Sequence, residues 1–185
     1  MANVQLNVFE LTPGINVSTA TISQNFVHFK HIYFPGSISW NTPYVLISQG
    51  NVNARITFSV GLYSINGASL SLANSASGAY SANGFSWVSL ATSATQNITP
   101  GDWFVAYAKS TSGNAGITVM NQNVLGQVAA GSSIESTGYA GPFFGGRLAN
   151  SSGAFPGSVA TSDLSKDFKD GSRTYIRIPY IVISA

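Results

Sequence analysis

Charge is the first thing that this sequence has little of. Asp, Glu, Lys and Arg make up 8% of the 185 residues, whereas about 25% is usual in soluble domains. The 8 basic and 6 acidic residues give a net charge of +2, and no cluster of Lys and Arg could neutralise a row of phosphates. We therefore expect no nucleic-acid partner. Disorder is not expected either, because the chain carries 12% aromatic residues.

Cysteine is absent, which excludes a disulfide framework, a thiol nucleophile and a Cys-based zinc site. No stretch resembles the ~20 consecutive apolar residues of a membrane-spanning helix. Residues 1–20 lack the charged start and the continuous apolar run of a signal peptide. We therefore expect neither a membrane partner nor export through a secretory leader.

The side chains that usually carry catalysis are also scarce. His28 and His31 are three residues apart in a strand-like stretch, so they face opposite sides of it and make a poor metal or catalytic pair. Asp102 falls in a turn, where we expect it to cap the backbone. Neither a Gly-x-Ser-x-Gly motif nor a phosphate-cradling glycine loop is present. The carboxylates that could serve an enzyme are few: Glu10, Asp102, Glu135, Asp163, Asp167 and Asp170. We therefore predict no catalytic residue, no cofactor and no metal.

What the sequence does contain is a series of stretches with a period of two. The clearest lies within residues 97–110, where Pro100-Gly101 makes a turn whose glycine accepts a positive φ. After the turn, Trp103, Val105 and Tyr107 alternate with smaller residues on the other side of a predicted strand. Most of the large aromatic residues alternate in this way, so we interpret them as core rather than as ligand-stacking surfaces.

A second clear stretch runs from Ala54 to Tyr63, with Ile56, Phe58, Val60 and Leu62 on one face. Asn66-Gly67 is a strong hairpin signal after it, and Ser69 to Leu72 is expected to pair back. Residues 73–84, rich in Ser, Ala, Asn and Gly, predict a flexible loop.

These stretches add up to about eight to ten short strands with turn signals at the spacing of a sandwich. We predict an all-β, two-sheet antiparallel β-sandwich of jelly-roll type, with an N-terminal arm at 1–24 and a single domain at 25–185. Thr161 to Asp163 is expected to cap one helical turn at Leu164 to Phe168. In the last strand, Pro179 cannot donate a ladder hydrogen bond and predicts a free edge or a bulge.

Two regions stand out as candidate interfaces. About half of all charges fall near residues 163–173, which indicates either a solvated turn with internal ion pairs or a charge contact between subunits. A calcium loop fits less well, because lysines interrupt the carboxylates. Residues 124–158 form a long, Gly-rich connection of the kind that is usually functional. The candidate interface residues are Asp163, Lys166, Asp167, Lys169, Asp170, Phe143, Phe144 and Arg147.

Several stretches resemble β-rich virion proteins of tailed bacteriophages, including capsid decoration or cement proteins and tail-fibre head modules. The resemblance covers about residues 56–110 and 155–183, and it rests on strand and turn patterns rather than on a catalytic signature. The stretches that carry it are Ile56–Ser64, Ser69–Ser75, Trp87–Phe104 and Arg173–Ile183.

The resemblance implies a jelly-roll module that is usually trimeric and is used for attachment or for clamping a shell. No shaft repeat is visible and the chain starts at Met1, which favours a small independent subunit. The expectation is therefore a non-enzymatic decoration or cement protein on the capsid surface of a virion. It would be made in the host cytoplasm without a signal peptide, form a homotrimer and bind the major capsid protein of the same particle.

Two other functions stay open at this point. One is a tail-fibre or surface module that binds a glycan or a host receptor through Tyr, Trp and Asn side chains in loops. The other is an enzyme such as a polysaccharide depolymerase, which the scarcity of carboxylates and histidines argues against. Loss of a hydrolytic activity on changing Asp163 or Glu135 would support the enzyme.

Overall fold

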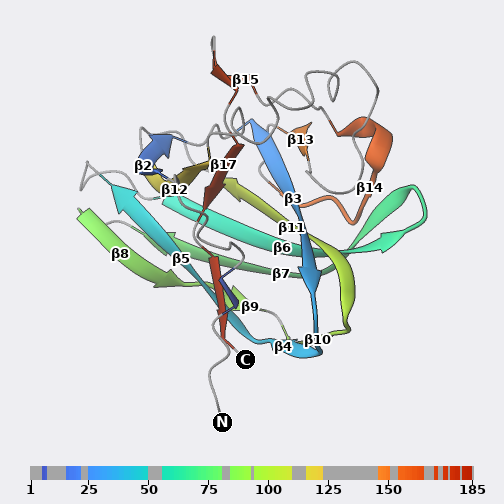
Figure 1. Cartoon of the computed structure of the whole chain (residues 1–185). Coiled ribbons are helices and arrows are strands. Elements are labelled where there is room, and N and C mark those ends of the chain that lie inside the picture. Colours follow the sequence, from blue (N-terminus) through green and yellow to red (C-terminus); the bar gives the residue numbers. More distant parts are fainter. Residues whose placement is uncertain are drawn as a thin grey trace.

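The structure of the chain is a computed structural model that describes residues 6–7, 16–21, 25–49, 56–80, 84–92, 94–109, 116–122, 146–150, 154–164, 169–170, 173–174, 176–179 and 181–184. Most of these residues lie in antiparallel strands (Figure 1). The helical structure among them is one 3-10 turn, η1 (Thr161–Asp163). The prediction of an all-β chain is confirmed.

The first of two large sheets has seven strands. Their order is β1-β18-β5-β12-β17, with β2 beside β12 and β8 beside β5. Because β1 pairs with β18, the two ends of the described chain meet in this sheet. Its strands are β1 (Leu6–Asn7), β2 (Asn16–Thr21), β5 (Thr42–Gln49), β8 (Gly84–Ser89), β12 (Gly116–Gln122), β17 (Ile176–Pro179) and β18 (Ile181–Ser184).

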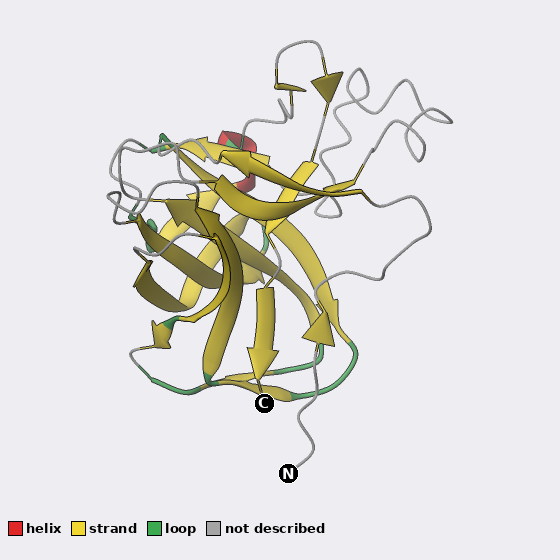
Figure 2. Cartoon of the chain, turned by 90° about the vertical axis from the view of Figure 1, so that its left-hand side faces the viewer, coloured by secondary structure: helices red, strands yellow, loops and turns green. Residues whose placement is uncertain are grey.

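The second large sheet also has seven strands, in the order β13-β3-β11-β6-β7-β14 with β9 beside β7. They are β3 (Phe26–Phe34), β6 (Ile56–Asn66), β7 (Ser69–Tyr80), β9 (Ala91–Thr92), β11 (Gly101–Lys109), β13 (Gly146–Ala149) and β14 (Ser158–Ala160). Two small ribbons complete the described strands: β4 (Ile38–Trp40) with β10 (Gln96–Ile98), and β15 (Lys169–Asp170) with β16 (Arg173–Thr174). Figure 2 shows how strongly the longer strands curve and twist.

Apolar side chains form two clusters, one on each face of the second sheet. In β11, Val105 and Tyr107 belong to the inter-sheet cluster, where Val45 of β5 and Val88 of β8 meet them from the first sheet. The contact between the sheets is therefore sandwich-like. The buried members of the inter-sheet cluster are Ile32, Phe34, Trp40, Val45, Ile56, Phe58, Val60, Leu62, Ala76, Tyr80, Leu90, Ile98, Val105 and Tyr107.

The second, outer cluster covers the opposite face of the same sheet. Phe104, Ala106 and Ala108 of β11 point into it, and the chain from Phe155 to Leu164 closes over them. A sheet that is buried on both faces has apolar residues at consecutive positions. This explains why β11 is buried from Phe104 to Lys109 and not only at every second residue. The predicted alternation of larger and smaller side chains separates the two clusters.

The two predicted turn glycines behave as expected. Gly67 follows Asn66 with φ of 58°, and Gly101 follows Pro100 with φ of 131°. Both values are unfavourable for residues that carry a Cβ atom. The hairpin prediction is confirmed, because Asn66 pairs with Ser69 at the start of the β6–β7 ladder.

The prediction of a flexible loop at 73–84 is wrong, because β7 continues to Tyr80 along the whole of β6. The small residues that suggested a loop fit a crowded site. A Cβ atom at Gly78 would stand 2.9 Å from the carbonyl oxygen of Ser89, so a larger residue could not pack there. Burial and the ladder beside β6 thus override a composition with low β-propensity.

The predicted helix near residue 164 differs from the structure. Thr161–Asp163 form the 3-10 turn themselves, no side chain caps it, and Leu164 has extended backbone angles. Residues 165–168 lie outside the described part of the chain. Near the C-terminus, β17 ends at Pro179 and pairs with β12, whereas β18 begins at Ile181 and pairs with β5. The last predicted strand is therefore divided at the proline.

The arm at 1–24 and the domain at 25–185 stay predictions. The described parts of residues 1–24 are β1 and β2, and both pair within the first large sheet.

Candidate functional site

The predicted interface residues fall into three groups. Phe143, Phe144, Lys166 and Asp167 lie outside the described residues. Lys169 and Asp170 form strand β15, which pairs with β16 at Thr174 and Arg173, and their side chains are not described. Asp163 is exposed in η1, where it accepts a 3.4 Å hydrogen bond from the hydroxyl of Ser162. The contact between subunits at these residues stays a prediction.

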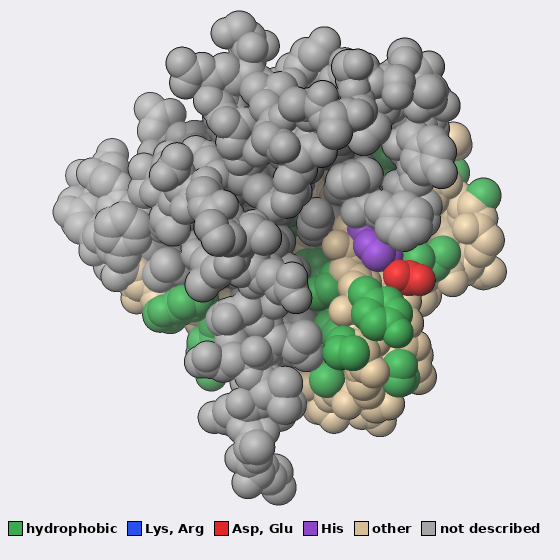
Figure 3. Space-filling view, in the orientation of Figure 1, with side chains coloured by type: hydrophobic (Ala, Val, Ile, Leu, Met, Phe, Trp, Pro, Cys, Tyr) green, Lys and Arg blue, Asp and Glu red, His purple; other side chains and the backbone are tan. Residues whose placement is uncertain are grey.

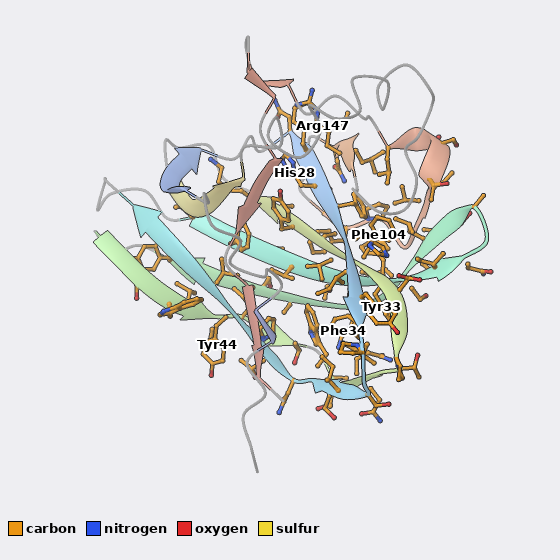
Figure 4. The ribbon with its side chains drawn as sticks, viewed as in Figure 1. His28, Tyr33, Phe34, Tyr44, Phe104 and Arg147 are labelled. Carbon is orange, nitrogen blue, oxygen red and sulfur yellow. The ribbon has the colours of Figure 1, made fainter. Side chains whose placement is uncertain are left out.

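Arg147 is the remaining member of the predicted interface, and it packs against the start of β3. It stands opposite His28 in the β13–β3 ladder, and its guanidinium carbon lies 4.4 Å from the ring centre of Phe26. This is a cation–π contact, which favours a guanidinium over an aromatic face. Figure 4 shows Arg147 and His28 together at this end of β3.

The two histidines lie on opposite faces of β3, as predicted. The ring of His28 stacks on Tyr107 of the inter-sheet cluster at 4.9 Å between centroids. The ring of His31 meets Phe104 of the outer cluster edge-on at 5.5 Å. The two imidazoles therefore cannot act on one bound group.

His31 instead forms a pair with Asp102 that the sequence prediction missed. Asp102 does not cap a turn but belongs to β11, where its Oδ1 atom lies 2.8 Å from Nε2 of His31. An ionised carboxylate only accepts hydrogen bonds, so Nε2 donates the proton. The His31 side chain is 11% exposed and that of Asp102 is 54% exposed. One partner is thus held by the fold and the other is open to solvent.

Tyr33 completes this polar constellation. It stands directly opposite Asp102 in the β3–β11 ladder, so both side chains project from the same face. Tyr33 is 59% exposed. Figure 3 shows the acidic and histidine side chains side by side, with hydrophobic side chains around them. We call Tyr33, His31 and Asp102 the Tyr33 site; only the β3–β11 register brings them together.

A separate aromatic surface lies on the outer face of the first sheet. The core prediction holds for Trp40, which is fully buried, but fails for Trp87, which is 49% exposed. Tyr44 is 37% exposed and pairs with Ser89, two residues beyond Trp87 on the same face of β8. We call Tyr44 and Trp87 the β5–β8 face. Hydrophobic side chains are open to solvent in this region of Figure 3.

Among the buried groups outside both surfaces, Lys109 and Tyr63 have shifted pKa values. Lys109 is 3% exposed, and burial lowers its pKa below the ordinary value of 10.5. Tyr63 is fully buried and its hydroxyl donates to the carbonyl oxygen of Pro156 at 2.7 Å. Burial raises the pKa of Tyr63 far above its ordinary value of 10.0, because the charged form is disfavoured away from water.

Comparison with known proteins gives no match to a family model, to a curated protein or to a solved structure. Within the described residues, no group of three or more His, Asp or Glu side chains is placed to hold a metal ion. In the same part of the chain, no helix has the length and apolar character needed to cross a membrane. The two surfaces defined above are therefore the features on which a functional proposal can rest.

Proposed function

We propose that the chain is a non-enzymatic structural protein of a virion, and specifically a decoration or cement protein that trimerises on a capsid and stabilises its shell. The observation that carries this proposal is the exposed aromatic β5–β8 face at the edge of a sheet. The resemblance to tailed-bacteriophage virion proteins supplies the biological setting.

The physical argument begins with strand β8. Among the described residues β8 pairs with β5 alone, so its other edge offers ladder groups to another chain. Trp87 and Tyr44 expose large rings on this face. Burying such rings is favourable at about 25 cal/mol per Å², and Trp and Tyr are the residues that most often dominate the energetics of interfaces. A neighbouring subunit would cover both the rings and the edge.

The proposal also includes a jelly-roll arrangement of the strands. Two seven-stranded antiparallel sheets pack through the inter-sheet cluster, and neighbouring strands such as β3 and β11 are distant in sequence. Such connections favour a jelly roll over a simple meander. In this arrangement we assign residues 1–24 as an arm whose strands β1 and β2 add to the first large sheet. The predicted interface around residues 143–170 would contact either the major capsid protein or a neighbouring subunit.

Light scattering on the purified chain tests the assembly. We expect a mass three times the 19.3 kDa of one chain. Trp87→Ser should shift the mass toward that of a monomer while the far-ultraviolet circular dichroism stays unchanged. Tyr33→Ser, which removes an exposed ring from the other sheet, is the matched control and should leave the trimer intact. If the wild type is a monomer at every concentration, the trimer is refuted. If Trp87→Ser remains a trimer, the β5–β8 face is not the subunit interface.

The copy number and location of the chain in the particle test whether it is a capsid protein. Quantitative mass spectrometry of particles that carry the chain should find it at a copy number comparable to that of the major shell protein. A few copies located at the tail would instead support the second candidate, a receptor- or glycan-binding module. The exposed Tyr33 beside Asp102 is the observation that favours that candidate.

A further inference from the structure

The Tyr33 site combines a ring and a carboxylate that both face solvent. Tyr33 stands opposite Asp102 across the β3–β11 pair, and cross-strand partners have Cβ atoms about 5 Å apart. Asp102 accepts its hydrogen bond from His31 at Oδ1, and the described residues give Oδ2 no hydrogen-bond donor. One carboxylate oxygen is thus positioned by the fold and open to a ligand.

Apolar side chains border the site and lie beneath it. Ile65 of β6 is exposed and lies two residues after Tyr63, so it projects from the same face of the sheet as Tyr63. Tyr63 belongs to the outer cluster together with Phe104, against which His31 packs. The imidazole of His31 therefore packs against the buried ring of Phe104, and it positions the carboxylate of Asp102 through the hydrogen bond to Oδ1.

We propose that the Tyr33 site binds a neutral pyranose sugar. A pyranose ring has an apolar C–H face that can lie on the tyrosine ring, as other apolar surfaces do. Its hydroxyl groups can donate to Oδ2 of Asp102 in a charge-assisted hydrogen bond. The inference goes beyond the shell-binding function and does not depend on it, because the site is on the second sheet and the β5–β8 face is on the first (Figure 4).

A cationic ligand is the main alternative, and the pairing of Asp102 argues against it. One of the two carboxylate oxygens already accepts the hydrogen bond from Nε2 of His31, and the Asp102 side chain is 54% exposed, so water screens its attraction for a cation. A sugar hydroxyl needs only one oriented acceptor oxygen, which Oδ2 provides.

Saturation-transfer difference NMR on the full chain tests the site. The probes are the methyl glycosides of β-glucopyranose and β-galactopyranose, with tetramethylammonium as the cationic probe. We expect saturation transfer to the ring C–H protons of at least one glycoside. Tyr33→Ala should weaken its Kd about tenfold, the size of a lost aromatic contact. Ser77→Ala, which truncates an exposed side chain of β7 outside both named surfaces, is the control and should leave Kd unchanged.

Asp102→Asn tests the second half of the site. The amide keeps an oxygen that can accept from Nε2 of His31 but removes the carboxylate, so we expect weaker glycoside binding with an unchanged fold. The proposal is overturned by the absence of transfer to both glycosides, by transfer to tetramethylammonium alone, or by equal binding in Tyr33→Ala. Since the light-scattering mass is read separately, failure here leaves the trimer test unaffected.

Discussion

The ring of Phe155 lies directly over Gly61. A Cβ atom at Gly61 would stand 3.1 Å from Cδ2 of Phe155 and 3.2 Å from Cε2 of Tyr63. The ring of Phe155, more than ninety residues later in the chain, therefore fills the space that a side chain at Gly61 would occupy. The same segment is held by the hydrogen bond from Tyr63 to Pro156 and by one from the amide of Leu72 to the carbonyl oxygen of Gly157.

Gly61→Val should destabilise the chain by about 1–3 kcal/mol, the usual penalty of overpacking. Valine has the higher β-propensity, worth up to about 1 kcal/mol, but the displaced ring outweighs it. Urea denaturation measures the change. In a Phe155→Ala background the same substitution should cost clearly less, because only the contact with the ring of Tyr63 remains. A similar destabilisation in both backgrounds would contradict the close contact.

Tyr63→Phe should cost about 1–3 kcal/mol at pH 7, because it leaves the carbonyl oxygen of Pro156 without its donor. The raised pKa of Tyr63 adds a pH dependence. Above pH 10 the phenol ionises in the unfolded chain but not in the folded one, so the wild type loses stability as pH rises. The difference in free energy of unfolding between the wild type and Tyr63→Phe should therefore narrow above pH 10, as urea denaturation at a series of pH values would show.

Tyr44→Phe is the matched control for this measurement, since its hydroxyl is lost from a partly exposed side chain on the other sheet. Its stability should stay within about 0.5 kcal/mol of the wild type. A gap between wild type and Tyr63→Phe that stays constant from pH 7 to above pH 10 would count against ionisation of the buried phenol.

Lys109→Met should make the folded chain more stable at pH 7. Burial lowers the pKa of Lys109 below 10.5, so the folded state resists the charged form and stability is reduced below the folded pKa. Between the folded pKa and 10.5 the unfolded chain binds more protons, so stability rises with pH. The advantage of the variant should shrink over this window, and thermal denaturation as a function of pH measures it. A less stable variant at pH 7 would show that interactions of the ammonium group outweigh its burial.

Asn74→Ala should cost about 1–2 kcal/mol, because the buried Asn74 side chain is the hydrogen-bond partner of two backbone groups. The Asn74 amide donates to the carbonyl oxygen of Ala94 at 2.7 Å and accepts from the amide of Ser75 at 2.8 Å. These bonds support the register shift of the β6–β7 ladder, where Leu62 pairs with Asn74 and Tyr63 with Leu72. Asn74→Asp keeps the acceptor but places a charged oxygen against the carbonyl oxygen of Ala94, so chemical denaturation at pH 7 should show it to be at least as unstable as the alanine variant.

Patterns within a few consecutive residues predicted the strands and turns that do not depend on pairing with distant parts of the chain. The alternation in Ile56 to Leu62 and after Gly101 was sufficient for β6 and β11, because a period of two follows from the geometry of a strand. The hairpin at Asn66-Gly67 was predictable because few residues accept a positive φ. The opposite orientation of His28 and His31 followed from their spacing alone.

The features that depend on strand pairing could not be predicted in this way. The loop prediction at 73–84 failed because β7 is stabilised by its ladder with β6 rather than by its own side chains. The His31–Asp102 pair joins residues 71 positions apart and exists only in one register of β3 against β11, since a slip of one residue reverses every side chain. The exposure of Trp87 likewise depends on which face of β8 meets the other sheet.

By itself, then, the sequence determined that this chain forms antiparallel strands with turns at Gly67 and Gly101, because backbone sterics and side-chain alternation act within a few residues. Only the tertiary structure decided that one sheet is buried on both faces, and which aromatic and ionisable groups stay at the surface. Those outcomes depend on register and on packing between segments far apart in the chain, and no local pattern encodes them.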